Sequence, residues 1–263
     1  MMSWNPFSRH SAPKKNVVSR SAERELEKEV KKAERLEETS RKLYKDTKRW
    51  MESNQGMMGS EHKITQNLLT SQLCQTEPQL CAQIADWDHS LEKQELYMKE
   101  LNTTVQKAVL EPMKKFNSIF PSIQTAVKKR EQSLQEYNRC QARLEKHQGR
   151  ERTGQNVVKL DAVLSKSQKA LRNAREDFET QNSNLTEDLP KMIEGRVDYF
   201  QPSLEALIKA QVAYNSEVYR MSTELSDQLS SQSSSGTCTK EERVNKIQQG
   251  LANIKALSIT LDE

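Results

Sequence analysis

The sequence predicts an all-α protein built from three long helices. Only 34% of its 263 residues are hydrophobic and 30% are charged, so a single rounded core of this size would lack apolar filling. Seven glycines and seven prolines are too few for the frequent turns of a sheet or barrel. Apolar residues instead recur at alternating three- and four-residue steps over long stretches, as in a coiled-coil seam. This sustained period favours long packed helices over a disordered chain, a β or α/β fold, or a large globular enzyme.

The first helix is expected from about Ser21, a good N-cap residue, to about Leu73. Gly56 and Gly59 lie inside this range, and each costs about 1 kcal/mol relative to alanine in a helix interior. We therefore expect a bend or a frayed turn there. The apolar stripe of this helix consists of Leu26, Val30, Ala33, Leu36, Leu43, Thr47 and Trp50.

The second helix is expected to begin with a capping box made by Thr76 and Gln79, with Pro78 in the first turn, where proline is tolerated. Its heptad register slips by one residue at Pro112. Pro112 and Pro121 should kink this helix without ending it, because the apolar pattern continues on both sides. The seam includes Leu80, Ile84, Trp87, Leu91, Met98, Leu101 and Val105, and then Met113, Phe116, Phe120, Ile123, Val127, Arg130 and Leu134.

The third helix follows a loop at 147–154 and carries a seam from Val157 to Leu225, with another register slip at Leu189 and Pro190. Two helices of roughly 70 residues are on the order of 100 Å long. Since short loops join them, the three helices must pack antiparallel.

The chain after Leu229 is expected to hold a serine-rich linker at 230–239 and a short helical tail at 240–263. Thr239 and Glu242 have the spacing of a capping box. The tail helix is amphipathic but contains Gly250, so it either docks on the bundle or frays.

Charge is distributed unevenly along the chain. Residues 114 to 175 hold 15 Lys and Arg against 5 Asp and Glu, a net of +10, and residues 1–20 add +4 without an acid. An antiparallel hairpin brings the basic parts of the second and third helices to one end, which indicates a polyanionic partner. This end has almost no aromatic residues for base stacking, so an anionic bilayer is a better match than nucleic acid.

Motifs of catalysis and metal binding are missing from the sequence. It has no glycine-rich phosphate loop, no G-x-S-x-G and no H-E-x-x-H, and its four cysteines form no C-x-x-C pair. We therefore expect no enzyme activity, no metal and no cofactor. No apolar run approaches 18 residues and the start lacks the apolar core of a signal peptide, so a cytoplasmic protein is expected.

Several short motifs, in their order along the chain, resemble those of a known family. They are residues 120–123, which lead into the basic run 128–130, then Tyr137, and later 189–190 followed by 196–200. Together with three long kinked helices, they are similar to the BAR domains of amphiphysins and bridging integrators over about residues 21–229. The chain after residue 229 is too short for the SH3 domain that most of that family carries. Residues 2–7 resemble the start of the short, SH3-less branch of the bridging integrators.

The resemblance implies a crescent-shaped coiled-coil homodimer that binds curved anionic phospholipid membrane through its concave face and tips. It also implies roles in actin organisation, cytokinesis and membrane trafficking, with a peripheral-membrane and cytoskeleton-associated location. The family's basic run continues where this chain has residues 131–133, Glu-Gln-Ser, so direct lipid affinity is expected to be weaker. From position and charge, the predicted membrane-binding residues are Lys128, Lys129, Arg130, Lys146, Arg150, Arg152 and Lys159.

A dimer interface is also expected from the residues themselves. A three-helix rod leaves more apolar side chains uncovered than one seam requires, and an isologous contact with a second copy would bury them. The predicted interface residues are Trp50, Ile64, Leu68, Ile84, Trp87, Phe200 and Leu204.

The N-terminal residues 1–20 alternate apolar and basic side chains. Trp4, Phe7, Lys14 and Lys15 would form a membrane-inserting amphipathic helix if a bilayer induces one, but prolines interrupt the pattern, so an unstructured tail is an equal alternative.

A second function stays open. The chain could be a coiled-coil adaptor that binds cytoskeletal proteins, actin regulators or small GTPases with little direct lipid binding.

Overall fold

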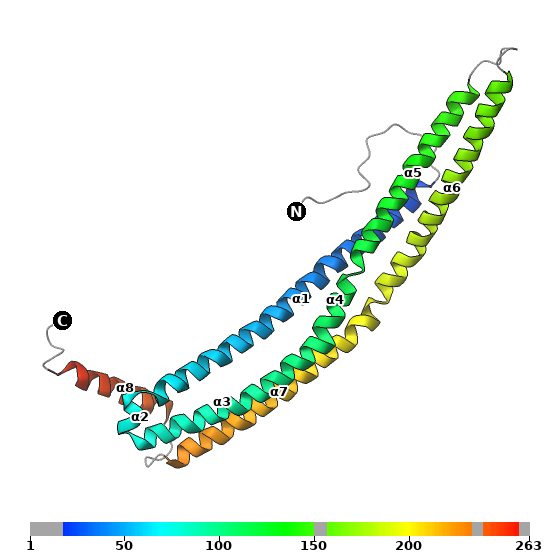
Figure 1. The fold of residues 1–263 in the computed structure, drawn as a ribbon. Coiled ribbons are helices and arrows are strands. Elements are labelled where there is room, and N and C mark those ends of the chain that lie inside the picture. Colours follow the sequence, from blue (N-terminus) through cyan, green and yellow to red (C-terminus); the bar gives the residue numbers. More distant parts are fainter. Residues whose placement is uncertain (1–17, 150–156, 233–238, 258–263) are drawn as a thin grey trace. The chain divides into compact units, whose positions relative to one another are not determined.

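A computed structural model describes residues 18–149, 157–232 and 239–257. Within these ranges the chain is almost entirely helical and contains no strand (Figure 1), which confirms the predicted all-α class. The three long helices of the prediction are α1, the series from α3 to α5, and the pair α6 and α7. The elements are α1 (Arg20–Leu69), α2 (Gln72–Thr76), α3 (Pro78–Val105), the π-helix η1 (Gln106–Leu110), α4 (Glu111–Asn117), α5 (Phe120–Gln148), α6 (Val157–Glu194), α7 (Arg196–Gln232) and α8 (Lys240–Lys255).

The chain forms two compact units. Of the described residues, the first combines 18–52 with 103–149 and 157–209, and the second combines 53–102 with 210–232 and 239–257. Both α1 and α7 contribute one part to each unit.

The core of the first unit lies where α1, α5 and α6 meet. The apolar stripes predicted from the sequence supply it, because each stripe presents one side of its helix to the neighbouring helices. Ile123, Ala126 and Met192 pack at its edge. The buried members of this core are Leu26, Val30 and Ala33 of α1, Val127 of α5, and Leu185 and Leu189 of α6.

The predicted register slip at Pro112 coincides with the π-helix η1. Proline has no N–H to donate to the carbonyl of Ala108, and its ring clashes with that carbonyl in a regular α-helix. The wider turn of η1 ends at Leu110, two residues before Pro112, and inserts one residue, which moves the seam by one position. The second interruption is at Ser118, whose N–H bonds to the carbonyls of Lys114 and Lys115 before α5 starts with Pro121 in its first turn. The helix is therefore kinked but continues, as predicted.

The break in the third helix lies at Gly195. The predicted slip of the apolar register is at Leu189 and Pro190, inside α6, and the helix itself is interrupted after Glu194. The Gly195 N–H still bonds to the Lys191 carbonyl at 2.9 Å, and a Cβ at Gly195 would lie only 3.3 Å from that oxygen. Glycine thus allows this turn to tighten where a larger residue would be crowded.

An aromatic cluster lies beside this break. The Phe116 ring of α4 contacts Phe120, Tyr199 and Phe200, with its centroid 4.7 Å from that of Phe200. The Tyr199 hydroxyl also donates to the Pro112 carbonyl at 2.9 Å. Aromatic contacts therefore join α4 to the first turns of α7.

The second unit packs the later part of α1 against α3, and α3 against the later part of α7. Asp88 of α3 accepts a short hydrogen bond from the buried Thr65 hydroxyl and a 3.2 Å hydrogen bond from Gln66. Gln94 donates to the Tyr214 hydroxyl of α7 at 3.0 Å, while burial raises the pKa of that tyrosine. Polar contacts thus supplement the apolar seam in this unit.

Two local expectations for this unit are wrong. The α1 helix runs without interruption through Gly56 and Gly59, because Met58 between them is buried and its packing offsets the low helix propensity of glycine. The capping box at Thr76 does not form, since the Thr76 hydroxyl donates backward to carbonyls within α2. The first helix also ends at Leu69 rather than near Leu73, and the short α2 lies between it and α3.

The capping box of α8 is confirmed. Thr239 Oγ1 accepts from the Glu242 N–H at 3.2 Å, and the Glu242 carboxylate accepts from the Thr239 N–H at 2.8 Å. The helix is formed rather than frayed, but its apolar side chains are exposed rather than docked on the bundle.

Candidate membrane-binding surface

The α5–α6 hairpin sets the positions of the basic side chains. The two helices are antiparallel and side by side (Figure 1), and Ser133 of α5 donates a short hydrogen bond to Asp177 of α6. One turn farther along α5, the Tyr137 ring lies beside the Phe178 ring of α6, with 6.4 Å between the centroids. This register places Lys146, in the last turn of α5, at the same end of the hairpin as Lys159 of α6.

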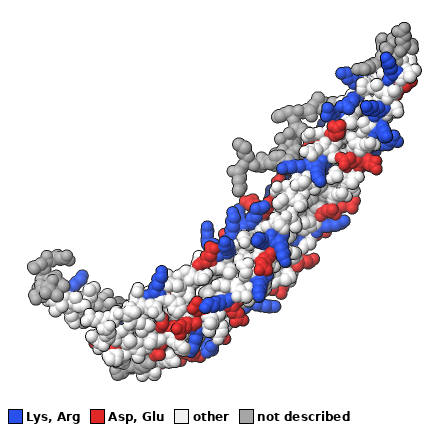
Figure 2. Space-filling model, in the orientation of Figure 1, with Lys and Arg blue, Asp and Glu red and all other residues white. Residues whose placement is uncertain are grey.

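The basic residues of this hairpin are mostly at the surface. Lys128, Lys129, Lys146 and Lys159 are all exposed. In the view of Figure 2, Lys and Arg side chains are spread along the α5 and α6 region, with Asp and Glu side chains among them. We call the exposed set Lys128, Lys129, Arg139, Arg143, Lys146, Lys159, Lys166 and Lys169 the hairpin basic surface.

Carboxylates compensate part of this charge. Arg139 lies 3.6 Å from Glu136, and Arg175 makes a 2.7 Å ion pair with Glu179 that raises the pKa of Arg175. Exposed pairs of this kind contribute little to stability and exchange easily with other partners. They leave the excess of positive charge on the hairpin in place.

Arg130 does not belong to this surface, and the prediction that it binds membrane is wrong. Its side chain is only 2% exposed. Its guanidinium contacts Glu23 of α1 at 2.6 Å and Asn182 of α6 at 2.8 Å, and lies 5.3 Å from the centre of the Phe178 ring. The sequence carried a signal for this position, because Arg130 occupies a seam place between Val127 and Leu134.

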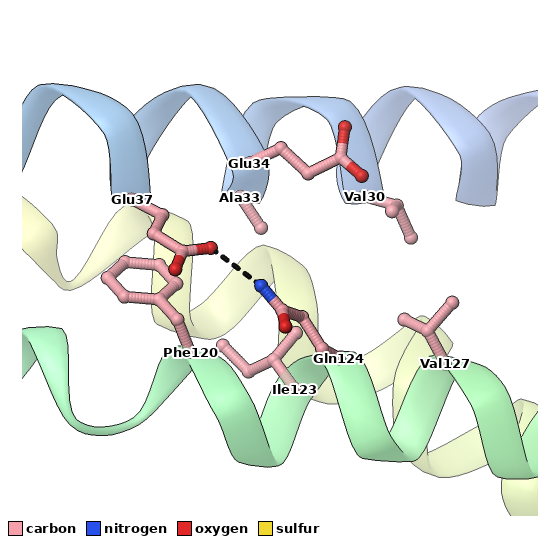
Figure 3. A pocket seen from close by; sticks show the side chains of 8 residues that line it. All are labelled: Val30, Ala33, Glu34, Glu37, Phe120, Ile123, Gln124 and Val127. Carbon is pink, nitrogen blue, oxygen red and sulfur yellow. Dashed lines mark hydrogen bonds between the residues drawn. The ribbon is translucent and has the colours of Figure 1, made fainter. Parts of the chain in front are cut away.

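A shallow depression between α1 and α5 lies outside the basic surface. It is open to solvent and has room for only about 20 Å³ of water, and Figure 3 shows Val30, Ala33, Phe120 and other apolar side chains that line it. Glu34 and Glu37 are at its rim, where Glu37 accepts from Gln124 at 2.9 Å. Carboxylates at the rim repel lipid phosphate, so the candidate surface is confined to the lysine-bearing sides of α5 and α6.

Several predicted site residues lie outside the described ranges. These are Trp4, Phe7, Lys14 and Lys15 of the N-terminal segment, and Arg150 and Arg152 of the loop between α5 and α6. Their roles stay predictions.

The predicted dimer residues differ in exposure. Ile64 and Leu204 are 49% and 57% exposed, in agreement with side chains that need a partner. Ile84 is 7% exposed within the single chain, so the expectation that it is uncovered is wrong: its seam place on α3 turns it inward. Trp50, Leu68, Trp87 and Phe200 are half-buried.

Two further exposed apolar residues lie on α7: Val197, which was expected to be covered in the seam of the third helix, and Ile208, which the sequence reasoning missed. Val197 and Ile208 are 52% and 53% exposed. They lie seven and four residues from Leu204, so they share its side of the helix. The helical spacing from Leu204 was the available signal.

The described residues contain neither a metal cluster nor a membrane-spanning segment. Among them no cluster of His, Cys, Asp and Glu could hold a metal ion. None of the helices they form has a segment long and apolar enough to cross a bilayer.

Comparison with known proteins identifies the fold family. A family model described as "BAR domain" matches residues 12–231. The chain is 40% identical over 262 residues to bridging integrator 3 of Homo sapiens, covering 100% of both chains. It is 30% identical over 168 residues to the "Regulator of cytoskeleton and endocytosis RVS161" of Candida albicans, covering 62% of this chain and 59% of that one. The solved amphiphysin BAR domain from Drosophila superposes with a TM-score of 0.67 at 18% identity, covering 86% of this chain and 100% of that chain. With its kinked α-helices and full-length similarity to a bridging integrator, the chain belongs to the BAR domain family.

Proposed function

We propose that this protein is a non-enzymatic scaffold that binds anionic phospholipid bilayers as a homodimer and responds to their curvature. It would act peripherally on cytoplasmic membrane surfaces and link them to actin organisation, cytokinesis and membrane trafficking. The observation that carries the proposal is the hairpin basic surface on a BAR fold. The printed name of the Candida albicans relative, a regulator of cytoskeleton and endocytosis, supports the cellular role.

The physical basis is electrostatic. Each Lys or Arg near an anionic membrane contributes about 1 kcal/mol, and a homodimer presents every such residue twice. The hairpin residues are exposed point charges on helices, which suits a surface of phosphate headgroups better than a pocket for one ligand. Salt should weaken the attraction, because the Debye length falls from about 10 Å at 0.1 M to about 3 Å at 1 M.

Co-sedimentation with vesicles tests the proposal. The full chain should pellet with phosphatidylserine-containing vesicles, fail to pellet with purely zwitterionic ones, and be released by salt. A series of vesicle diameters at constant lipid composition tests the response to curvature. Absence of binding to anionic vesicles at low salt would reject the lipid part of the proposal.

A protein-binding adaptor is the second candidate. Outside residues 1–20 and 114–175 the chain carries a net charge of −10, which suits a basic protein partner better than a membrane. The basic run on α5 also ends at the half-buried acid Glu131, which reduces the positive charge available to a membrane there. If the full chain does not bind vesicles but retains actin regulators or small GTPases in a pull-down, this second function replaces the first.

A further inference from the structure

The α8 helix presents its apolar side chains to solvent. Val244, Ile247, Leu251 and Ile254 are 44%, 71%, 51% and 58% exposed. They recur at steps of three and four residues, so they form one row along the helix. A helix of 16 residues is marginal by itself in water, and an exposed apolar row adds no stability until something covers it.

Basic side chains border this row. Arg243 precedes Ile247 by four residues, and Lys255 follows Leu251 by four. Residues four apart are neighbours on a helix surface, so each of these cations lies next to an apolar member of the row. The two acids, Glu241 and Glu242, are confined to the first turn, where Glu242 completes the capping box.

We propose that α8 is an interfacial anchor that lies on an anionic bilayer, with Val244, Ile247, Leu251 and Ile254 in the headgroup–acyl boundary. This inference rests on the membrane function proposed above and adds a second contact, separate from the hairpin basic surface. Helices with an apolar row, bordering cations and low overall hydrophobicity bind in this way. The apolar row supplies insertion and the cations supply attraction to lipid phosphate.

A second copy of α8 fits this row less well. Read as a heptad seam, Val244 and Leu251 take a positions while Ile247 and Ile254 take d positions, and the preceding d position is Lys240. The flanking e and g positions hold two cations, Arg243 and Lys255, and one acid, Glu241, together with Gln248 and Gly250. Paired helices would therefore set more cations than acids beside the seam and would place a lysine at one seam position, whereas an anionic bilayer complements the cations along the row.

The test compares two matched variants of the full chain. Ile247→Gln with Leu251→Gln replaces the centre of the row. Asn245→Gln with Asn253→Gln introduces the same side chains on the opposite side of α8. Losing two aliphatic side chains that would be buried in the bilayer should weaken binding to phosphatidylserine vesicles about tenfold or more. The control variant should bind as the unaltered chain does.

Hydrogen exchange provides the second readout. Amides of residues 240–255 should exchange more slowly when vesicles are added to the unaltered chain, and this protection should be lost in the Ile247→Gln, Leu251→Gln variant. Equal vesicle binding by both variants, or no added protection, overturns the inference while leaving the hairpin surface intact. A fall in oligomer mass in the row variant, measured without lipid, also overturns it in favour of self-association.

The failure of the function and the failure of the anchor can be told apart. If the unaltered chain ignores anionic vesicles, the proposed function fails and the anchor fails with it. If the unaltered chain binds and only the hairpin lysines matter, the function stands without the anchor. Residual binding of a Lys128→Glu, Lys129→Glu chain that disappears when the α8 row is also changed supports the anchor directly.

Discussion

Arg130 Nη2 lies 2.6 Å from Glu23 Oε1, an ion pair that ties the middle of α5 to the first turn of α1 across 107 residues of sequence. The arginine is almost fully buried, whereas the glutamate side chain is 25% exposed. Asn182 and the Phe178 ring complete the surroundings of the guanidinium. A single side chain on α5 thus joins three helices of the first unit.

Removal of the glutamate should cost more than removal of the arginine. Glu23→Ala leaves a buried guanidinium without its counter-charge and should lower the free energy of unfolding by roughly 3 kcal/mol. Arg130→Met removes the charge and keeps most of the volume, so its cost should be smaller. Chemical denaturation of both variants measures the difference, and a larger loss in Arg130→Met would contradict the burial argument. Folded Arg130→Met should bind vesicles as the unaltered chain does, because the arginine is not at the surface.

The α5 lysines should control membrane binding. Lys128→Glu with Lys129→Glu removes four cations from a dimer, which corresponds to a loss of roughly 4 kcal/mol of binding free energy near an anionic surface. Circular dichroism should show an intact fold, since both side chains are exposed. The matched control is Lys191→Glu with Lys209→Glu, which makes the same charge change on exposed residues of α6 and α7. Vesicle co-sedimentation that is equal for the two double variants would show that net charge, and not the hairpin surface, governs binding.

The dimer should depend on an exposed apolar residue of α7. Leu204→Glu puts a charge at a side chain that is 57% exposed in the single chain, so folding should tolerate it while an isologous interface would meet the charge twice. The dimer dissociation constant should rise about tenfold or more, as measured by analytical ultracentrifugation. Val158→Glu is the control, because Val158 is 83% exposed at the start of α6. An unchanged mass for Leu204→Glu at low concentration would remove this residue from the interface.

Gly250→Ala should stabilise α8. A Cβ at Gly250 meets nothing within 4 Å, and alanine is favoured over glycine in a helix interior by about 1 kcal/mol. Amide exchange within α8 should slow about fivefold, while Ala252→Gly should have the opposite effect. Faster exchange in Gly250→Ala would mean that the glycine is needed for a contact along this side of the helix.

Cys140 should be a slow nucleophile at neutral pH. Burial raises the pKa of its thiol, and the hydrogen bond to the Glu136 carboxylate at 3.4 Å raises it further. A higher pKa means less of the reactive thiolate at a given pH, so alkylation by iodoacetamide should be slower than for a free thiol and should accelerate as pH rises. Glu136→Gln should speed the reaction. Mass spectrometry of the Cys140 peptide measures both rates, and alkylation as fast as that of glutathione would refute the assignment.

The sequence by itself determined the helical class and the main apolar seams. It also determined that the seam of the second predicted helix changes register at Pro112. These features follow from local spacing, since an apolar period of 3.5 residues specifies one buried side whatever its neighbours are. The Thr239–Glu242 capping box was predictable for the same reason, because its two partners are only three residues apart. The excess of basic residues in 114–175 was equally visible, although their exposure was not.

Tertiary structure decided the features that depend on distant partners. Arg130 reads as one more cation of a basic run until Glu23 and Asn182 are placed beside it. Ile84 reads as an interface residue until its own chain covers it, and the glycines of α1 stay helical because Met58 between them is buried. The thermodynamic cost of a buried charge or a helical glycine is offset by contacts between residues far apart in the chain, and a local pattern contains no information about those contacts.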